Sequence, residues 1–218
     1  MIDRRELIAG TSLFAILATL NLQLAVPASA QGAAPAELMT PPVLGDMSVG
    51  NPNASVTVIE YSSLWCSHCG HFHRTIYPQL KKRYINTGKI NFVFREFPLN
   101  ERGAVGSMLA RCAARDGGRD RFFAVVDMLF AKQDVWAYVK DPAPPLRTLA
   151  KQVGFTQQAF DACIGDQKLL DALDAEQTRA GSKFGVDATP TFFVNGQKLQ
   201  GVDSIRDLAR AIDPLLKN

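Results

Sequence analysis

The feature that most constrains this chain is a pair of cysteines separated by two residues, Cys66 and Cys69, directly after an apolar run. Residues 55–61 are β-branched and apolar, which is typical of a strand buried in a mainly parallel sheet. Residues 71–84 carry apolar side chains at a four-residue spacing, which predicts a helix. Two cysteines at this spacing can form a disulfide only near the first turn of a helix, where both sulfurs share one face. The expected local structure is therefore strand, short loop, cysteine, helix.

This arrangement favours a thiolate at Cys66. The unpaired backbone N–H groups and the dipole at a helix N-terminus stabilise an anion, and a cationic His68 would stabilise it further. Because the thiolate is the attacking species in disulfide exchange, we expect Cys66 to be the nucleophile and Cys69 the resolving thiol. A thiolate pKa about three units below pH 7 would favour the reduced form by roughly 4 kcal/mol, or about 90 mV in a two-electron couple. That difference is enough to separate an oxidant from a reductant.

Composition and charge exclude some function classes. The 218 residues are 47% hydrophobic and 21% charged, as in an ordinary globular protein, and allow one domain with an insertion. The formal net charge is +3 without any basic tract. We therefore expect no nucleic-acid partner.

The first 30 residues indicate an export signal, and the pattern predicts cleavage after Ala30. Arg4 and Arg5 form the basic start, residues 13–26 the apolar stretch, and Ala28-Ser29-Ala30 the small-residue cleavage site. The apolar stretch is short for a bilayer span, so a retained transmembrane helix is the weaker interpretation. The paired arginines also fit a twin-arginine signal, which leaves both export routes open. Either route predicts a periplasmic protein.

All four cysteines lie in the predicted mature chain, and an oxidising compartment favours two disulfides. The close spacing of Cys66 and Cys69 selects one pair, which leaves Cys112 with Cys163. That bond would close a loop of about fifty residues and contribute roughly 4 kcal/mol to stability. The alternative is two separate buried thiols that pack as small hydrophobic side chains.

Strand signals occur at both ends of the mature chain. Residues 31–46 are rich in Ala and Pro and predict a flexible lead-in, and residues 46–49 predict a short edge strand. Residues 89–97 predict a second strand, parallel to the first because a crossover helix, kinked at Pro78, separates them. Near the C-terminus, Asn195-Gly196 lies between two short strands and predicts a hairpin. A final helix over 205–216 follows, capped by Ser204 or Asp203.

The middle of the chain contains no comparable strand signal. From residue 101 to about 183 the apolar spacing predicts a helical block, broken at Gly117-Gly118, at 141–145, at Gly154 and at Gly165. The expected helices are 105–115, 122–131, 146–153, 157–164 and 168–184. Cys112 and Cys163 both fall on these helices.

Taken together, residues 47–218 resemble the DsbA-like thiol:disulfide oxidoreductases of the thioredoxin superfamily. The resemblance rests on the strand leading into Trp65-Cys66-Ser67-His68-Cys69, on the helical block, and on Ala-Thr-Pro-Thr-Phe-Phe-Val-Asn-Gly at 188–196. It implies an α/β thioredoxin fold with a helical insertion between the two halves of the central sheet. The thioredoxin-like domain would then comprise 47–99 and 170–218, and the insertion 100–169.

The resemblance also implies roles for three further residues. Pro190 would follow a cis peptide bond and pack opposite the Cys66–Cys69 disulfide, with a trans proline that opens a strand as the alternative. Thr189 would present its backbone to an extended substrate peptide. Glu60 matches the buried acidic residue beneath the disulfide, where it could accept a proton from Cys69. The alternative for Glu60 is a surface position.

The implied function is an exported enzyme that introduces disulfides into unfolded or reduced exported proteins. It would need no cofactor and would be re-oxidised by a membrane quinone-linked partner resembling DsbB. Ser67 and Thr189 replace the Pro and Val of the best-known DsbA, so the direction of the reaction stays open between an oxidase and an isomerase or reductase. The short lead-in, without a dimerisation domain before the fold, favours a monomeric oxidase.

Two other classes of function use the same residues. Cys66, Cys69 and His73 share a helical face and could bind zinc, but no convincing fourth ligand is present, and we expect no metal site. His71 and His73 are then expected at the helix surface. A chaperone with an inert cysteine pair is the third class, and it would still bind unfolded clients after Cys66→Ala.

Overall fold

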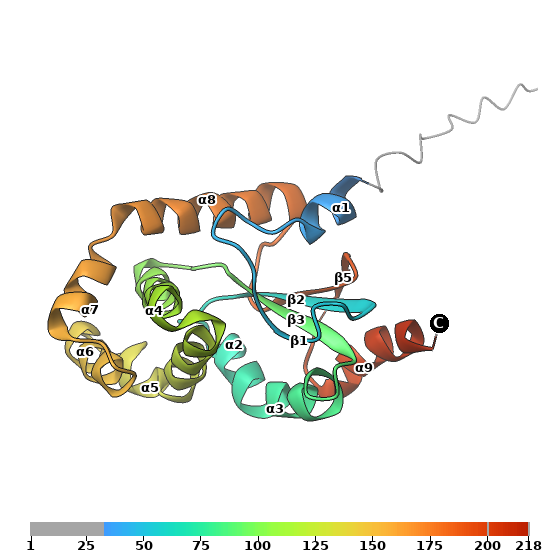
Figure 1. Ribbon diagram of the computed structural model, residues 1–218, viewed down its shortest axis with the longest axis horizontal. Helices are drawn as coiled ribbons and strands as arrows, with labels where there is room; N and C mark the ends of the chain where they lie inside the picture. Colours follow the sequence, from blue (N-terminus) through green and yellow to red (C-terminus); the bar gives the residue numbers. More distant parts are fainter. Residues whose placement is uncertain (1–32, 200, 218) are drawn as a thin grey trace, which may run out of the picture.

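A computed structural model describes residues 33–199 and 201–217 of the chain. The predicted export signal and its cleavage site after Ala30 lie outside these residues. Five strands form one mixed sheet in the order β1-β3-β2-β4-β5, with helices on both faces (Figure 1). The strands are β1 (Met47–Gly50), β2 (Val56–Ser62), β3 (Ile90–Glu96), β4 (Thr191–Val194) and β5 (Gln197–Leu199). This α/β architecture is the predicted fold class.

The strand pairing follows from the apolar pattern. β2 and β3 pair in parallel, from Val56 opposite Ile90 to Ser62 opposite Glu96, and both strands are buried on their two faces. β1 pairs antiparallel with β3 at one edge, where the sequence predicts an edge strand. β4 and β5 form the predicted hairpin, turned by Asn195 and Gly196 at φ angles of 45° and 86°.

The helices surround the sheet in three groups. In Figure 1, α8 runs along one face of the sheet, α2, α3 and α9 cover the other, and α4 to α7 gather beyond one end of the strands. The helical elements are α1 (Ala33–Met39), α2 (Ser67–His71), η2 (Phe72–Ile76), α3 (Tyr77–Leu80), η3 (Lys81–Ile85), α4 (Glu101–Ala131), α5 (Gln133–Trp136), α6 (Ala143–Gln152), α7 (Gln157–Ile164), α8 (Gln167–Phe184), α9 (Ile205–Ile212) and η4 (Asp213–Leu216). Ser204 caps α9 through a capping box with Asp207.

The helix after the cysteines is irregular, as the proline predicts. Two π-helical turns, η2 and η3, alternate with the α-helical segments α2 and α3, and Pro78 lies in the first turn of α3. Because proline has no N–H, a wider turn before it avoids an unmet helical hydrogen bond. The result is one continuous but deformed helix beneath the sheet.

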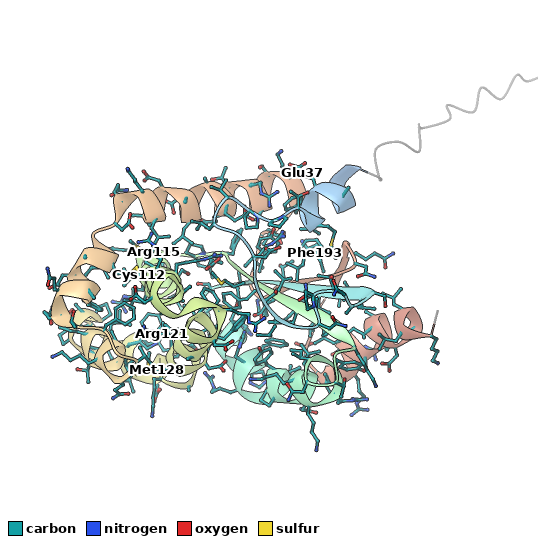
Figure 2. The ribbon with its side chains drawn as sticks, in the orientation of Figure 1. Glu37, Cys112, Arg115, Arg121, Met128 and Phe193 are labelled. Carbon is teal, nitrogen blue, oxygen red and sulfur yellow. A yellow bond between two sulfur atoms is a disulfide. The ribbon has the colours of Figure 1, made fainter. Side chains whose placement is uncertain are left out.

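The helical block is held together by a disulfide. Cys112 on α4 and Cys163 on α7 are bonded, with Cα atoms 6.1 Å apart, and Figure 2 labels Cys112 where these two helices meet. The backbone of α4 is kinked at Gly117 and Gly118, at the break that the sequence predicts. The domain boundaries at residues 100 and 169 stay a prediction.

The part of the lead-in that the structure describes contacts Arg95 of β3, and its flexibility stays a prediction. Its described part contains α1, and the side chain of Leu38 is 2% exposed. The Arg95 guanidinium donates to the carbonyl oxygens of Leu38 and Thr40 and to the carboxylate of Asp46. A buried guanidinium needs acceptors for all its N–H groups, and this segment supplies most of them.

The apolar core lies on both faces of the sheet. The larger cluster joins the sheet to α2, α3, α4 and α9, and a smaller one, which includes Leu38, Ile59 and Val93, lies between the sheet, α1 and α8. Among residues 33–199 and 201–217, no helix is both long and apolar enough to cross a bilayer.

Candidate active site

Cys66 lies at the end of the loop that follows β2 and forms the N-cap of α2. Its backbone is extended, with φ −70° and ψ 125°, so the first N–H groups of the helix point toward its sulfur. Its side chain is 6% exposed, whereas Cys69, one helical turn later, is fully buried. The two thiols are free and close enough for Cys69 to donate a hydrogen bond to the sulfur of Cys66.

The two cysteines have opposite acidities. The hydrogen bond from the Cys69 thiol, helped by Thr189 and by the backbone N–H groups of Cys69 and His68, lowers the pKa of Cys66 to about 5 although burial opposes this. Burial raises the pKa of Cys69 well above its usual value, and the negative charges of Cys66 and Glu60 raise it further. At neutral pH the site therefore holds a thiolate at Cys66 and a thiol at Cys69. The side chain of His68 is exposed, so its role as a cation beside Cys66 stays a prediction.

The loop before β4 lies against Cys66. The Thr189–Pro190 peptide bond is cis, as the resemblance implied. The sulfur of Cys66 lies 3.2 Å from the carbonyl oxygen of Thr189 and donates to it when Cys66 is protonated, and Thr189 is 8% exposed. Residues 123 positions apart thus meet at the nucleophile.

Glu60 is buried beneath this site and pairs with a histidine. It is fully buried on β2, and the Nε2 atom of His73 lies 2.9 Å and 3.2 Å from its two carboxylate oxygens. The prediction of a surface position for His73 is therefore wrong: the residue is 7% exposed, because α4 covers it and its ring stacks on Phe130. His71 is exposed, as predicted.

The imidazole of His73 thus faces Glu60 and not the two sulfurs. Within the described parts of the chain, no three side chains of His, Cys, Asp or Glu are grouped so that they could hold a metal ion.

Sequence reasoning missed a glutamine that holds the active-site loop. The side-chain amide of Gln133 donates to the carbonyl oxygens of Leu64 and Cys66 at 2.8 Å and 2.9 Å. The close approach explains Gly70, because a Cβ atom there would lie 1.9 Å from Oε1 of Gln133. Gln133 lies 67 positions after Cys66, and no local pattern marks it.

Two aromatic side chains form the rim of the site. Trp65 donates through Nε1 to the carbonyl oxygen of Ala137, and the hydroxyl of Tyr138 donates to the carbonyl oxygen of Trp65. Their rings meet edge to face with centroids 6.2 Å apart. Tyr138 is 50% exposed, so an aromatic ring borders the nucleophile at the surface. Tyr138, which follows α5 in the chain, lies near Cys66 only because of tertiary packing.

Comparisons with known proteins agree with this geometry. Residues 43–214 match the family described as thioredoxin. A Rickettsia typhi protein named as a protein-disulfide oxidoreductase is 34% identical over 79% of this chain and 63% of its own length. The crystal structure of alpha-DsbA1 from Wolbachia pipientis superposes with a TM-score of 0.76 and 33% identity, and covers 83% of this chain and 95% of that one. Disulfide bond formation protein D of Bacillus subtilis is 25% identical over 81% of this chain and 80% of its length.

This chain covers only part of the length of its Rickettsia relatives. The chain spans 60% to 65% of the length of the Rickettsia proteins that it matches, so those proteins contain a large segment without a counterpart in the aligned part of this chain.

Proposed function

The chain belongs to the thioredoxin superfamily, among its DsbA-like members, and from this premise we propose that it is a thiol:disulfide oxidoreductase that oxidises exported proteins through Cys66 and Cys69. The observation that carries the proposal is the opposite acidity of the two thiols. A pKa of about 5 makes Cys66 a stable thiolate, while Cys69 stays a thiol. Stabilisation of this thiolate favours the reduced pair, so the disulfide is a strong oxidant.

The first step opens the disulfide of the enzyme. A client thiolate attacks Sγ of Cys66, the Cys66–Cys69 bond breaks, and its electron pair goes to the sulfur of Cys69, which gains a proton. Attack at Cys66 is favoured because Cys69 is fully buried and Cys66 is not. Thr189, whose carbonyl oxygen lies beside Cys66, would bind the client backbone as an added strand.

The second step releases the oxidised client. A second client thiolate attacks the client sulfur of the mixed disulfide, a client disulfide forms, and Cys66 leaves as the thiolate. Its low pKa makes Cys66 a good leaving group. The client has then lost two electrons, and the enzyme has gained them.

Compartment and partners are part of the same proposal. The predicted export signal supports a periplasmic location, where reduced exported proteins would be the clients. The two electrons would pass to a membrane quinone-linked partner resembling DsbB. The aromatic rim formed by Trp65 and Tyr138 is suited to contact unfolded clients, which expose apolar side chains.

The reduction potential of the Cys66–Cys69 pair tests this proposal. We would equilibrate the protein in glutathione buffers, with the variant Cys112→Ala/Cys163→Ala as a control that isolates the active-site pair. A Cys66 pKa about two units below pH 7 favours the reduced form by about 2.7 kcal/mol, or about 60 mV. The potential should fall by about 59 mV per pH unit below pH 5 and by about 30 mV per unit above it, because only one thiol then takes up a proton.

The result also separates the oxidase from the alternative. A potential well above the thioredoxin range, with the change of slope near pH 5, supports the oxidase. A strongly reducing potential would instead make the protein an isomerase or reductase with the same two cysteines. Absence of any exchange with glutathione would leave only a binding role.

A further inference from the structure

The exchange at Cys66 raises the question of how a proton reaches Cys69. Cys69 and Glu60 are both 0% exposed, so neither side chain exchanges protons with bulk water directly. Cys69 leaves the disulfide as a thiolate, and burial strongly disfavours that charge. The proton must therefore pass through other groups of the protein.

His73 lies between Glu60 and a cavity that is open to the surface. In the described part of the chain, His73 is the one side chain that hydrogen-bonds to the Glu60 carboxylate, at 2.9 Å and 3.2 Å. The same residue lines a cavity of about 470 Å³ between the active-site helix and the end of α4. Neither Cys66 nor Cys69 lines this cavity, so it is a second approach to the buried acid.

The orientation of the His73 ring is fixed. The ring stacks on Phe130, with centroids 4.1 Å apart and 18° between the planes, and Tyr77 packs against it at 4.8 Å. Nε2 faces Glu60, while Nδ1 is buried without a hydrogen-bond partner. A buried polar atom without a partner is rare and costs free energy, which points to a function. An imidazole can accept a proton at one nitrogen while it donates from the other.

Several elements place titratable or charged groups near this ring. These groups are Glu60 from β2, Arg74 from η2, Tyr77 from α3, Lys81 from η3 and Asp127 from α4. Arg74 is engaged with the carbonyl oxygen of Phe130, and burial raises the pKa of Tyr77 so that it stays neutral. Burial raises the pKa of Asp127, while the positive charges of Lys81 and His73 oppose this shift. His73 therefore interacts with a second acidic group, Asp127, which lines the same cavity.

We propose that His73 relays the proton that Cys69 gains when the disulfide opens, from water in the cavity and through Glu60. One proton moves from Nε2 to Glu60 and on to the sulfur of Cys69, while the buried Nδ1 takes one from a water molecule that enters from the cavity and leaves as hydroxide. The imidazole ends with as many protons as before, and the path reverses when the pair is re-oxidised. This inference rests on the thiol exchange proposed above. His73 is a positioning residue, because it acts on Cys69 through Glu60.

The test measures how fast the disulfide opens. Oxidised protein is mixed with reduced glutathione between about pH 5 and pH 8, and mixed-disulfide formation at Cys66 is followed by acid quench and mass spectrometry. His73→Ala should slow this step by about 100-fold near neutral pH, the usual effect of losing an acid–base group. His73→Gln keeps a donor for Glu60 but cannot relay a proton, so it should be equally slow. His71→Ala is the matched control on the same helix and should retain the wild-type rate.

Chemical rescue separates the relay from a structural role. Because the cavity is open to solvent, added imidazole should restore most of the rate of His73→Ala, in proportion to its concentration. The double variant Glu60→Gln/His73→Ala should stay slow in imidazole, since the next carrier of the proton is gone. Thermal unfolding of each variant shows that it is folded.

Each result has one meaning. Slow exchange in His73→Ala and His73→Gln, with rescue of the first that requires Glu60, supports the relay. A wild-type rate in His73→Gln at every pH overturns it, as does rescue that is independent of Glu60. If wild-type protein itself does not exchange with glutathione, the proposed enzymatic function fails, and the relay fails with it.

Discussion

Two neighbouring residues of β2 support buried polar groups on opposite faces of the sheet. Tyr61 faces α8, where its hydroxyl donates to Glu176 and accepts from Arg95. Glu60 faces the active-site helix and pairs with His73. The two groups are similar in burial but differ in how completely their hydrogen bonds are satisfied.

The Arg95 group on the α8 face is complete. Arg95 is 1% exposed, and all five of its N–H groups are used. The acceptors are both carboxylate oxygens of Asp46, the carbonyl oxygens of Leu38 and Thr40, and the hydroxyl of Tyr61. Such a network fixes the segment before β1 against the sheet and has no free site for a proton or a ligand.

The Glu60–His73 pair on the other face is incomplete. Nδ1 of His73 has no partner, and the ring is fixed by aromatic contacts instead of by a second hydrogen bond. This pair also lies next to Cys69, whose pKa the Glu60 charge raises. We therefore interpret the complete network as structural and the incomplete one as the place where protons move.

The largest expected effect is the pH dependence of the reduced protein. The pKa of Cys66 is lowered from 9.0 to about 5, so its contribution to stability grows as the pH rises above 5 and disappears as the pH falls through 5. Between pH 5 and pH 8 the reduced form should gain about 4 kcal/mol relative to the oxidised form, which lacks this thiol. Urea unfolding of both forms at several pH values measures the gain.

Two variants test which face of the sheet carries the group that causes the pH dependence of stability. Cys66→Ser removes the titrating thiol and should abolish the dependence. Arg95→Met should keep it, because the Arg95 network makes no contact with Cys66. A pH effect that persists in Cys66→Ser would assign the titration to another group.

The second effect is a loss of stability on the α8 face. Arg95→Met leaves Asp46 and two buried carbonyl groups without their donor, and should cost about 3 kcal/mol in the free energy of unfolding. The value lies at the low end for a buried pair because the Asp46 side chain is 19% exposed. Oxidised and reduced protein should lose the same amount, and the Cys66 pKa should not change.

A surface ion pair supplies the control for this variant. Arg115, labelled in Figure 2, pairs with Asp166 at the surface, so Arg115→Met should destabilise the protein far less. Equal losses of unfolding free energy in the two variants would show that the buried Arg95 network stabilises the protein no more than a surface ion pair does. Chemical denaturation at neutral pH measures both.

Features that depend on short local patterns could be predicted from the sequence. Cys66, Cys69 and the Asn195-Gly196 turn are short local patterns whose physics requires a particular backbone, so their neighbourhoods could be predicted. The strands and most helices follow from apolar spacing for the same reason. The parallel pairing of β2 and β3 follows from the helix between them.

Contacts between distant segments could not be predicted. Four-residue spacing does not reveal that the end of α4 covers His73, since Phe130 is 57 positions further along the chain. Gln133 and Tyr138 reach the active-site loop from the same distant region. The position of the lead-in likewise depends on Arg95, whose need for acceptors appears only when β3 is buried.

The third expected effect is a loss of stability from substitution of Glu60, on the active-site face of the sheet. Glu60→Gln removes the charge but keeps an acceptor for His73, and should cost about 2 kcal/mol, less than Arg95→Met, because only one charge-assisted hydrogen bond weakens. The pKa of Cys69 should fall, since the Glu60 charge raises it. Thiolate absorbance, compared between Cys66→Ala and Cys66→Ala/Glu60→Gln, measures that pKa. An unchanged pKa would mean that Glu60 does not act on Cys69.

The smallest effect concerns the loop that contacts the nucleophile. Thr189→Val removes the Thr189 hydroxyl, which is buried beside Cys66 without a hydrogen-bond partner and is free to donate to the thiolate, so the pKa of Cys66 should rise and the thiolate should lose about 1 kcal/mol of stabilisation. The reduction potential should fall by about 20 mV, because a less stable thiolate makes a weaker oxidant. Thr191→Val is the matched control, since the Thr191 hydroxyl donates to the Ala188 carbonyl oxygen and not to Cys66. Equal changes in the two variants would assign the effect to altered loop packing, whereas a change confined to Thr189→Val assigns it to the hydroxyl beside the sulfur.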